Sequence, residues 1–483
     1  MLKYPPVWPD EALFANPAVN LLHHGRMATD LLDGILPGIA QHTYWQPPLY
    51  FLYIASVFQF TGPGLVPLRL ASTAAAVAVL ILTYLLAVRT GLGSWVSLLP
   101  VCLVALDAVF LRGALMGRMD MLALFFILLS LWLATKSDAP LNSFLTGIVC
   151  ALAGLTHPVG AVAAISVVIW RLLSRETRTP RVLLPLLIGI LLPFLPWLAY
   201  IALDPPSFVA QFGGQLARKS VGHVSVAFLP TSFFRLIAQY AFEDGRLIDV
   251  VWVLPLLFFG MAGLRDTELR LRPNDSPERR SLLLLCGCQV LTIAVVLLNS
   301  EFWYTLYIIP ITAIGLCHLL NNGRSFASLG WARIALTSVV LVWIGGFLCS
   351  NLQHALRLNY LENVVYRSET DYGGWSSETG RKIPPGSRVL LSIIPDPYFG
   401  LKIRNDLSFR EYLPEMIPVN HDIYWRYMSQ ADYVIVGSGL RSPSNTVEEF
   451  LRSNGTLIDT VGRTDKGYFA QIYRINGSSF TSR

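Results

Sequence analysis

The residues best suited to chemistry begin with an acidic pair, Asp10 and Glu11, in the stretch WPDEALFA. Two adjacent carboxylates in front of a hydrophobic segment have two interpretations. They can open a helix, because negative charge is stabilised at a helix N-terminus. They can also supply a general base close to a membrane surface. The pair alone does not decide between the two, so the decision depends on the elements around it.

A second charged group contains Asp107, Arg112, Arg118 and Asp120 and lies where two apolar segments meet. Charged side chains at bilayer depth cost about 2.5–3.5 kcal/mol on insertion scales, so each needs a reason. One reason is structural, because an ion pair such as Asp107 with Arg118 would lock a tight helical hairpin. The other is binding, because Arg118 beside Asp120 would place a carboxylate-held cation suited to a phosphate oxygen.

Other polar candidates are isolated in the sequence. Arg69 opens a hydrophobic segment and is either an interface anchor or a ligand. His157 lies in the turn LTHP and is either a structural residue or part of a site. Arg218 and Lys219 belong to the basic segment 204–247, which would either cover an anionic headgroup or form a solvated loop.

The composition places these residues on a membrane scaffold. Of the 483 residues, 53% are hydrophobic and 14% are charged, whereas soluble domains carry about 25% charged residues. The net charge of +6 comes from basic residues in short loops between apolar runs. No basic patch is interleaved with aromatic residues, so the pattern indicates a polytopic membrane protein and excludes a nucleic-acid-binding one. The cysteines lie within apolar runs, which predicts neither a disulfide framework nor a zinc site.

Apolar runs predict about ten membrane spans, since a span needs roughly 20 apolar residues and about 17 at the lower limit. A shorter run, Tyr50–Phe60, predicts a helix that lies in the membrane interface. The predicted spans are 68–88, 95–111, 119–135, 141–156, 158–173, 182–203, 248–264, 281–298, 302–320 and 333–350.

The basic residues set the orientation of these spans. Loops rich in arginine, such as 171–181 and 265–280, alternate with short loops that carry only Arg112 and Arg118. Basic loops stay in the cytoplasm. The N-terminal loop, the 112–118 turn, the LTHP turn, the 204–247 segment and the C-terminus are therefore predicted to be extracytoplasmic, which brings all the candidate residues to one side.

The C-terminal part differs in composition. The strand-like runs SRVLLSI, DYVIVGS, TLIDTVG and YFAQIYRI and the helix-like VEEFLRS predict a small α/β domain. The fold class is therefore an α-helical polytopic membrane protein with an extracytoplasmic α/β domain. Its predicted parts are a catalytic loop with the interfacial helix (1–67), the spans (68–350) and the C-terminal domain (351–483).

Several segments together resemble the GT-C glycosyltransferases of the protein-mannosyltransferase and aminoarabinose-transferase type. The resemblance covers residues 1–235 and is weaker through 350. It implies the GT-C fold, a polyprenyl-phosphate-linked sugar donor, and a lipid, protein or glycan acceptor. The segments that carry it, in the family's order, are WPDEALFA, QPPLYFLYIASVFQFTG, PLRLAST, GRMDMLALFFILLSLWLA, GLTHPVG and PFLPWLAY with PSFVAQF.

The resemblance also implies roles for single residues. Asp10 matches the catalytic aspartate of the family and Glu11 matches its partner, while Arg118 and Asp120 match an R-x-D pair. Sugar transfer needs a base for the acceptor hydroxyl and cations for the departing phosphate. Asp10 is therefore expected to be the base of a single inverting displacement. The phosphate would be steadied by Arg69, Arg118 or the adjacent Arg218 and Lys219.

The chain departs from the family pattern at three places. Gln46 replaces the basic residue that precedes the PP pair, and His157 replaces a frequent lysine at a substrate-binding position. Family members also have a spanning helix before the acidic motif, whereas this chain begins nine residues before Asp10. We expect an in-frame upstream extension of about 20 apolar residues, which the upstream gene sequence tests.

Two other classes of function stay open. A transporter of lipid-linked sugar is disfavoured, because the polar residues gather on one face and no paired, glycine-interrupted spans occur. A non-catalytic membrane partner built on the same scaffold is compatible with Gln46. No cofactor is predicted, and the sequence leaves open whether a divalent metal takes part.

Reporter fusions after Arg178 and after Arg388 test the predicted topology. The first fusion point is expected in the cytoplasm and the second outside, because an even number of spans puts both chain ends on one side. Finding both in the cytoplasm would separate the N-terminal loop from the donor's face and contradict the site.

Overall fold

The computed structural model describes residues 6–174, 177–215, 260–265, 276–298, 302–321, 372–401, 406–413, 421–437, 445–462 and 469–476, with isolated residues between 338 and 356. Arg218, Lys219 and most of the predicted spans 248–264 and 333–350 lie outside these residues.

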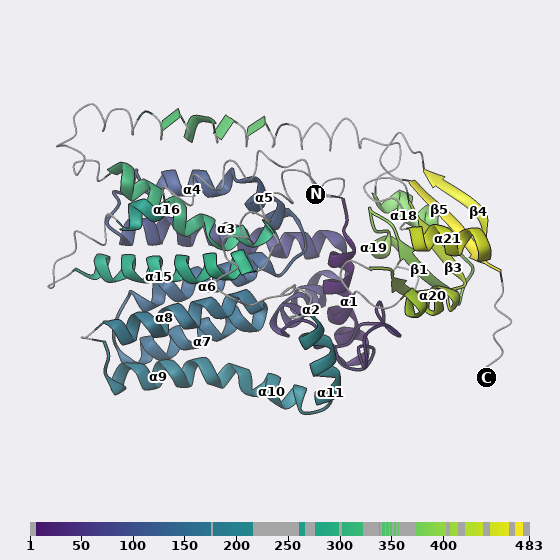
Figure 1. Ribbon diagram of the computed structural model, residues 1–483, viewed down its shortest axis with the longest axis horizontal. Helices are drawn as coiled ribbons and strands as arrows, with labels where there is room; N and C mark the ends of the chain where they lie inside the picture. Colours follow the sequence, from purple (N-terminus) through teal and green to yellow (C-terminus); the bar gives the residue numbers. More distant parts are fainter. Residues whose placement is uncertain are drawn as a thin grey trace.

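Apolar helices make up the larger part of the structure, and α6, α7, α8, α9 and α15 run side by side (Figure 1). The helices of this part are α3 (Leu65–Arg89), α4 (Leu98–Ala105), α5 (Ala108–Leu115), α6 (Asp120–Ala134), α7 (Pro140–Thr156), α8 (Ala161–Leu173), α9 (Pro180–Leu191), α10 (Leu195–Ile201), α15 (Pro277–Leu298) and α16 (Ile309–Asn321). Shorter helical pieces are η1 (Pro158–Gly160), η2 (Leu192–Phe194), α11 (Pro205–Phe208), η3 (Val209–Gly213) and η5 (Phe302–Tyr307).

Within the described part of the chain, two helical segments are long and apolar enough to cross a membrane: Leu65–Arg89 and Pro180–Ile201. The pair α4 and α5 would be a third, but it bends by 69°. Asp107 stands at the bend, where its carboxylate accepts a hydrogen bond from Phe110 N at 2.9 Å and caps α5. Further predicted spans coincide with apolar helices of 10–17 residues, so the total of ten remains a prediction.

The N-terminal loop folds around two helices, α1 (Pro9–His24) and α2 (Leu49–Thr61). Trp8 precedes α1 and its N–H donates to Glu11 Oε2 at 3.2 Å, which satisfies one amide of the first turn. The acidic pair therefore does open a helix, as one interpretation of the sequence predicts. The apolar run before the first span forms α2, as expected, and Phe14 of α1 stacks on Trp45 just before it, at 5.4 Å between ring centroids.

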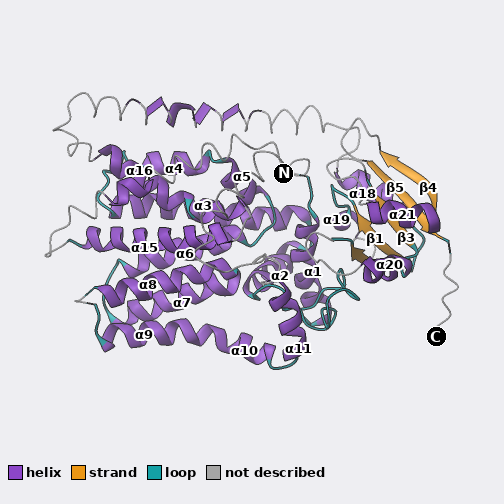
Figure 2. Ribbon diagram, viewed as in Figure 1, coloured by secondary structure: helices purple, strands orange, loops and turns teal. Residues whose placement is uncertain are grey.

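The C-terminal domain contains a mixed five-stranded sheet, and all the described strands lie in it (Figure 2). Its strand order is β2-β1-β3-β5-β4, with β1 parallel to β2 and β3, and β5 antiparallel to β3 and β4. Four strands and one helix match the runs read from the sequence, and β2 was not predicted. The elements are α18 (Tyr372–Arg381), β1 (Arg388–Ser392), α19 (Tyr398–Leu401), β2 (Ser408–Glu411), α20 (His421–Ser429), β3 (Tyr433–Val436), α21 (Asn445–Asn454), β4 (Gly455–Gly462) and β5 (Phe469–Ile475).

The N-terminal loop and the C-terminal domain share one hydrophobic core. Leu13 and Leu31 of the loop belong to the same buried cluster as Val389 and Tyr427 of the domain. The Tyr427 hydroxyl also donates to the Leu31 carbonyl at 2.7 Å. The loop is thus held between the helices on one side and the domain on the other, and Figure 1 shows α1 and α2 in this position.

Two glycines bring α7 and α9 together. A Cβ on Gly147 would lie 2.2 Å from the Leu186 carbonyl oxygen, and one on Gly189 would lie 2.2 Å from the Phe144 carbonyl oxygen. Small residues permit this close approach of two apolar helices.

Gly147→Ala is expected to lower the thermal stability of the purified protein. Overpacking of this kind costs about 1–3 kcal/mol, whereas a helical Gly→Ala change without a clash gains up to about 1 kcal/mol. Gly287→Ala in α15 is the matched control, because no atom lies within 4 Å of its added Cβ. Thermal unfolding in detergent measures both variants, and equal midpoints would contradict the packing argument.

Candidate active site

The two acidic residues of α1 point into different surroundings, because successive helical residues lie about 100° apart. Asp10 Oδ2 accepts a hydrogen bond from Arg118 Nη1 at 2.6 Å. The side chains of Asp10 and Arg118 keep 16% and 18% of their surface exposed. Asp10 is therefore a carboxylate held by a cation and still reachable from outside.

Arg118 lies at the centre of a chain of polar contacts. Its Nε donates to Asp120 Oδ2 at 3.0 Å. Asp120 Oδ1 accepts from the Tyr307 hydroxyl at 3.1 Å, so both carboxylate oxygens are bound. Arg118 is fixed between two carboxylates, a geometry that orients its guanidinium.

Glu11 is buried and forms a two-point ion pair with Arg69 of α3. Arg69 Nε and Nη2 donate to the two carboxylate oxygens at 2.9 and 2.8 Å, and both side chains have 0% exposure. The Gly117 N–H adds a third hydrogen bond to Glu11 Oε1 at 2.8 Å. Glu11 therefore connects α1, α3 and the turn before α6, and so fixes where Asp10 can be.

Gly117 permits this turn to approach α3. A Cβ at this position would lie 2.3 Å from Leu68 Cγ and 3.3 Å from Glu11 Oε1. The glycine of the GRMD motif is thus required by the packing beside the ion pair.

Arg112 lies next to the start of α1. Its guanidinium carbon is 3.4 Å from the Trp303 ring centroid and 5.4 Å from that of Trp8. Such cation–π contacts hold a cation at an aromatic surface. Arg112 therefore adds positive charge beside the Asp10 region.

His157 is connected to the polar contacts of Arg118 and Asp120 through the ring of Tyr307. Its Nδ1 accepts from Val159 N at 3.1 Å, and its ring stacks on Tyr307 at 5.7 Å and contacts Tyr304 at 5.4 Å. Its structural role is visible in these contacts, and Tyr307 joins it to Asp120.

A cavity of about 220 Å³ opens beside this aromatic layer, lined in part by Trp45, Gln46, His157 and Tyr304. Among the described residues, Trp45 Nε1 and Gln46 Oε1 find no hydrogen-bond partner although they are buried. Buried polar atoms are normally satisfied. Both atoms belong to side chains that line the cavity.

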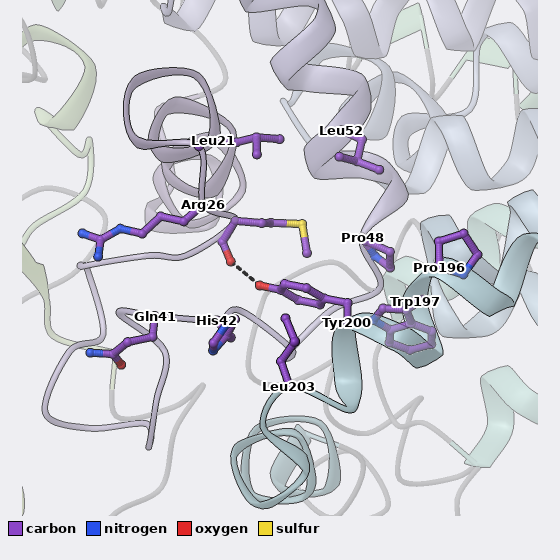
Figure 3. Close-up of a pocket in the computed structure, with 12 residues that line it drawn as sticks. Leu21, Arg26, Gln41, His42, Pro48, Leu52, Pro196, Trp197, Tyr200 and Leu203 are labelled. Carbon is purple, nitrogen blue, oxygen red and sulfur yellow. Dashed lines mark hydrogen bonds between the residues drawn. The ribbon is translucent and has the colours of Figure 1, made fainter.

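A larger cavity of about 400 Å³ lies beyond the C-terminal end of α1 (Figure 3). Leu21, Leu52 and Trp197 give it an apolar wall, and the Tyr200 hydroxyl donates to the Met27 carbonyl across it at 2.7 Å. Of the predicted site residues that the structure describes, none lines this cavity, so the smaller one is the candidate for the reacting groups.

The structure brings most of the predicted site residues together, with Asp10, Glu11, Arg69, Arg118 and Asp120 in direct contact and His157 one ring away. Arg218 and Lys219 lie outside the described residues. Asp107, considered as a partner for Arg118, caps α5 instead, and Arg118 binds two other carboxylates. Sequence reasoning missed Tyr307, which lies in the aromatic run FWYTLY inside the predicted span 302–320, where nothing local distinguishes it from a packing residue.

No cluster suited to a metal ion occurs in the described ranges, where no three His, Cys, Asp or Glu side chains gather in such a way.

Glu11→Gln is expected to destabilise the protein strongly, because it removes the carboxylate that binds the buried Arg69 guanidinium at two points. Breaking a buried pair costs about 3–5 kcal/mol, whereas an exposed pair is worth about 0–1 kcal/mol. Glu448→Gln, which removes the exposed pair with Arg452, is the matched control. Thermal unfolding measures the two, and similar losses would mean that the Glu11–Arg69 pair does not stabilise the fold.

Residues 11–211 match the family model of the dolichyl-phosphate-mannose-protein mannosyltransferases. No curated protein matches the sequence significantly. ArnT from Cupriavidus metallidurans, solved with undecaprenyl phosphate bound, has a similar structure, with a TM-score of 0.61 and 14% identity over 99% of this chain and 95% of that one. The archaeal oligosaccharyltransferase AglB from Archaeoglobus fulgidus, solved with an inhibitory peptide and a dolichol-phosphate, gives 0.54 and 12% over 89% and 65%.

Both comparisons agree with the resemblance inferred from the motifs. The matched segment contains Glu11, the α2 region and the R-x-D pair, and the structural likeness extends over nearly the whole chain, including the C-terminal domain. The resemblance is therefore confirmed: the chain has the GT-C glycosyltransferase fold and carries the protein-mannosyltransferase pattern over residues 11–211.

Proposed function

We propose that this protein is a membrane glycosyltransferase that moves a sugar from a polyprenyl phosphate to an acceptor hydroxyl on the extracytoplasmic face. The observation that carries the proposal is the difference in burial and binding partner between the two acids of α1. Glu11 is buried and bound to Arg69, whereas Asp10 is held by Arg118 and partly exposed. Asp10 is thus the acid of the pair that an acceptor can reach.

In the proposed reaction Asp10 takes the proton of the acceptor hydroxyl. The hydroxyl oxygen forms a bond to the anomeric carbon, and the bond from that carbon to the phosphate oxygen breaks with its electron pair. One displacement inverts the anomeric configuration and needs no second carboxylate as nucleophile.

The cations near Asp10 suit the departing phosphate. Arg118 and Arg112 lie beside the start of α1, and positive charge placed where negative charge develops lowers the barrier. Arg69 is bound to Glu11 inside the protein, so its proposed role is to position the loop. Arg218 and Lys219 stay proposed phosphate contacts from a neighbouring segment.

The cavity next to Gln46 and His157 is the proposed site of the lipid-phosphate end of the donor. It lies one aromatic layer from Asp120, through Tyr304 and Tyr307. Gln46 would contact the phosphate with a neutral amide, so the charge would come from the arginines. The family model supports this reading, since it is named for transfer of mannose from dolichyl phosphate.

The structures with similar folds support the same donor class. One was solved with undecaprenyl phosphate and another with a dolichol-phosphate and a peptide. The proposal takes the lipid phosphate from this agreement and leaves the sugar and the acceptor open.

Asp10→Asn is expected to lower the transfer rate by about 10²–10⁴, because the amide keeps the shape of the side chain but cannot take a proton. The assay uses protein in nanodiscs with labelled dolichyl-phosphate mannose and with undecaprenyl-phosphate sugars, and binding of undecaprenyl phosphate is measured separately. Asp33→Asn is the matched control, because Asp33 is a loop carboxylate with a half-exposed side chain.

Near-normal turnover of Asp10→Asn would contradict the mechanism. Binding of undecaprenyl phosphate by a wild-type protein that transfers no tested sugar would favour a non-catalytic partner. Movement of lipid-linked sugar between leaflets without transfer would favour a transporter.

A further inference from the structure

Two carboxyl groups lie buried against each other where the C-terminal domain meets the N-terminal loop. Glu411 is the last residue of β2, and Asp396 follows β1 by a few residues. The two strands are parallel neighbours, with Leu391 of β1 opposite Glu411, so their carboxyl ends meet at one edge of the sheet. The exposed fractions of Asp396 and Glu411 are 0% and 1%.

The backbones of these two residues hold both ends of the segment that carries Asp10. Asp396 N donates to the Val7 carbonyl at 2.8 Å, and Glu411 N donates to the Leu31 carbonyl at 2.8 Å. Val7 lies three residues before Asp10. A shift at this edge of the sheet would therefore be transmitted directly to the start of α1.

The side chains of the pair lie close enough to interact. The Glu411 carboxyl influences the pKa of Asp396 as a hydrogen-bonding neighbour, and Asp396 Oδ1 accepts from Tyr398 N at 2.8 Å. Two ionised carboxylates offer only acceptors and repel each other in a buried site. A hydrogen bond between them requires one proton, which the pair shares.

The surroundings favour this protonated state. Burial raises the pKa of Asp396 to about 7, and the negative charge of Glu11 also raises it, while hydrogen bonds from Glu411 and Tyr398 lower it. The Tyr372 hydroxyl donates to the Asp396 carbonyl at 2.6 Å. Among the described residues, the titratable and charged groups that act on the pair or its tyrosines are Glu11, Asp30 and Asp33 of the loop, Arg69 of α3, and Tyr372, Tyr398, Arg410, Tyr424 and Tyr427 of the domain.

We propose that Asp396 and Glu411 form a one-proton carboxyl pair that positions Asp10 for sugar transfer, and that loss of the shared proton displaces the start of α1 from Arg118. This inference rests on the proposed function of Asp10. Both residues are positioning residues, since they act through the Val7 and Leu31 carbonyls.

The direction of the pH effect follows from the pair. When the N-terminal loop is docked on the C-terminal domain, Asp396 holds its proton more tightly than it does in the undocked chain, where its ordinary pKa is 3.8. Docking is therefore strongest below that value and weakens as the pH rises from there through about 7. Above neutral pH the pair carries two negative charges and the loop loses its position.

The test follows kcat for transfer, and binding of undecaprenyl phosphate, from pH 5.5 to 8.5 in the full-length protein. In the wild type we expect kcat to fall by about tenfold per pH unit on the alkaline side, with little change in lipid-phosphate binding. Asp396→Asn and Glu411→Gln keep a donor between the two side chains without a titrating proton, so both are expected to remove the alkaline fall. Asp459→Asn, an exposed acid of the same sheet, is the matched control and should keep the wild-type profile.

Hydrogen exchange of residues 7–31 gives a second readout that needs no sugar donor. Exchange in this segment should rise between pH 6 and 8.5, beyond the intrinsic change, in the wild type, and should stay constant in the two variants. If kcat still falls at alkaline pH in both variants, the carboxyl pair is not the cause of the fall and the proposal is overturned. If amide exchange of residues 7–31 in the wild type does not depend on pH beyond the intrinsic change, the proposal of a titrating pair is overturned, even if both variants fail to fold.

The two proposals fail in different ways. Absence of transfer with every donor at every pH, combined with pH-dependent exchange in residues 7–31, would reject the proposed function and keep the pair. Transfer with a flat alkaline profile in the wild type would keep the proposed function and reject the pair.

Discussion

A buried carboxylate and a buried guanidinium are each costly alone and are stable only together. In this protein Glu11 and Arg69 meet this condition at the junction of α1, α3 and the turn before α6. Because Glu11 is adjacent to Asp10, the constraint on the buried acid also fixes the exposed one. Arg118, Asp120 and Tyr307 extend the network from Asp10 to the buried Tyr307 ring. The network therefore joins a desolvated ion pair, Glu11 with Arg69, to a partly exposed carboxylate, Asp10.

Much of the fold could be predicted from the sequence, since apolar runs and strand alternation are local patterns. α3, α2, α21 and four of the five strands fall where those patterns place them. β2 was missed because the four residues SFRE carry too little alternation to distinguish a strand. The acidic pair had two interpretations, and the structure supports the helix start without removing the other, because an acid at the first turn can be both a helix-stabilising charge and a base.

The site was predictable in its members but not in their pairing. Arg69, Arg118 and Asp120 could be chosen as polar residues near apolar segments, yet nothing local indicates that Arg69 binds Glu11 while Arg118 binds Asp10. These partners lie 58 and 108 residues apart. The contact between the C-terminal domain and the loop was beyond local patterns for the same reason, because it depends on packing between the two ends of the chain.

That contact has a consequence for how the protein is made. Asn16 donates to Tyr398 across 382 residues, and Tyr427 donates to Leu31 across 396. Contacts between distant residues form late, because the intervening chain must be ordered first. During synthesis the N-terminal loop emerges first, yet part of the core around it is supplied by the C-terminal domain, which emerges last. The loop therefore lacks its packing against the C-terminal domain, with Leu13 and Leu31 uncovered, until the last sixth of the chain has been synthesised. The carboxylate proposed to do the chemistry would then reach its final position only when the protein is nearly complete, so an unfinished chain would carry the acid without the arrangement around it.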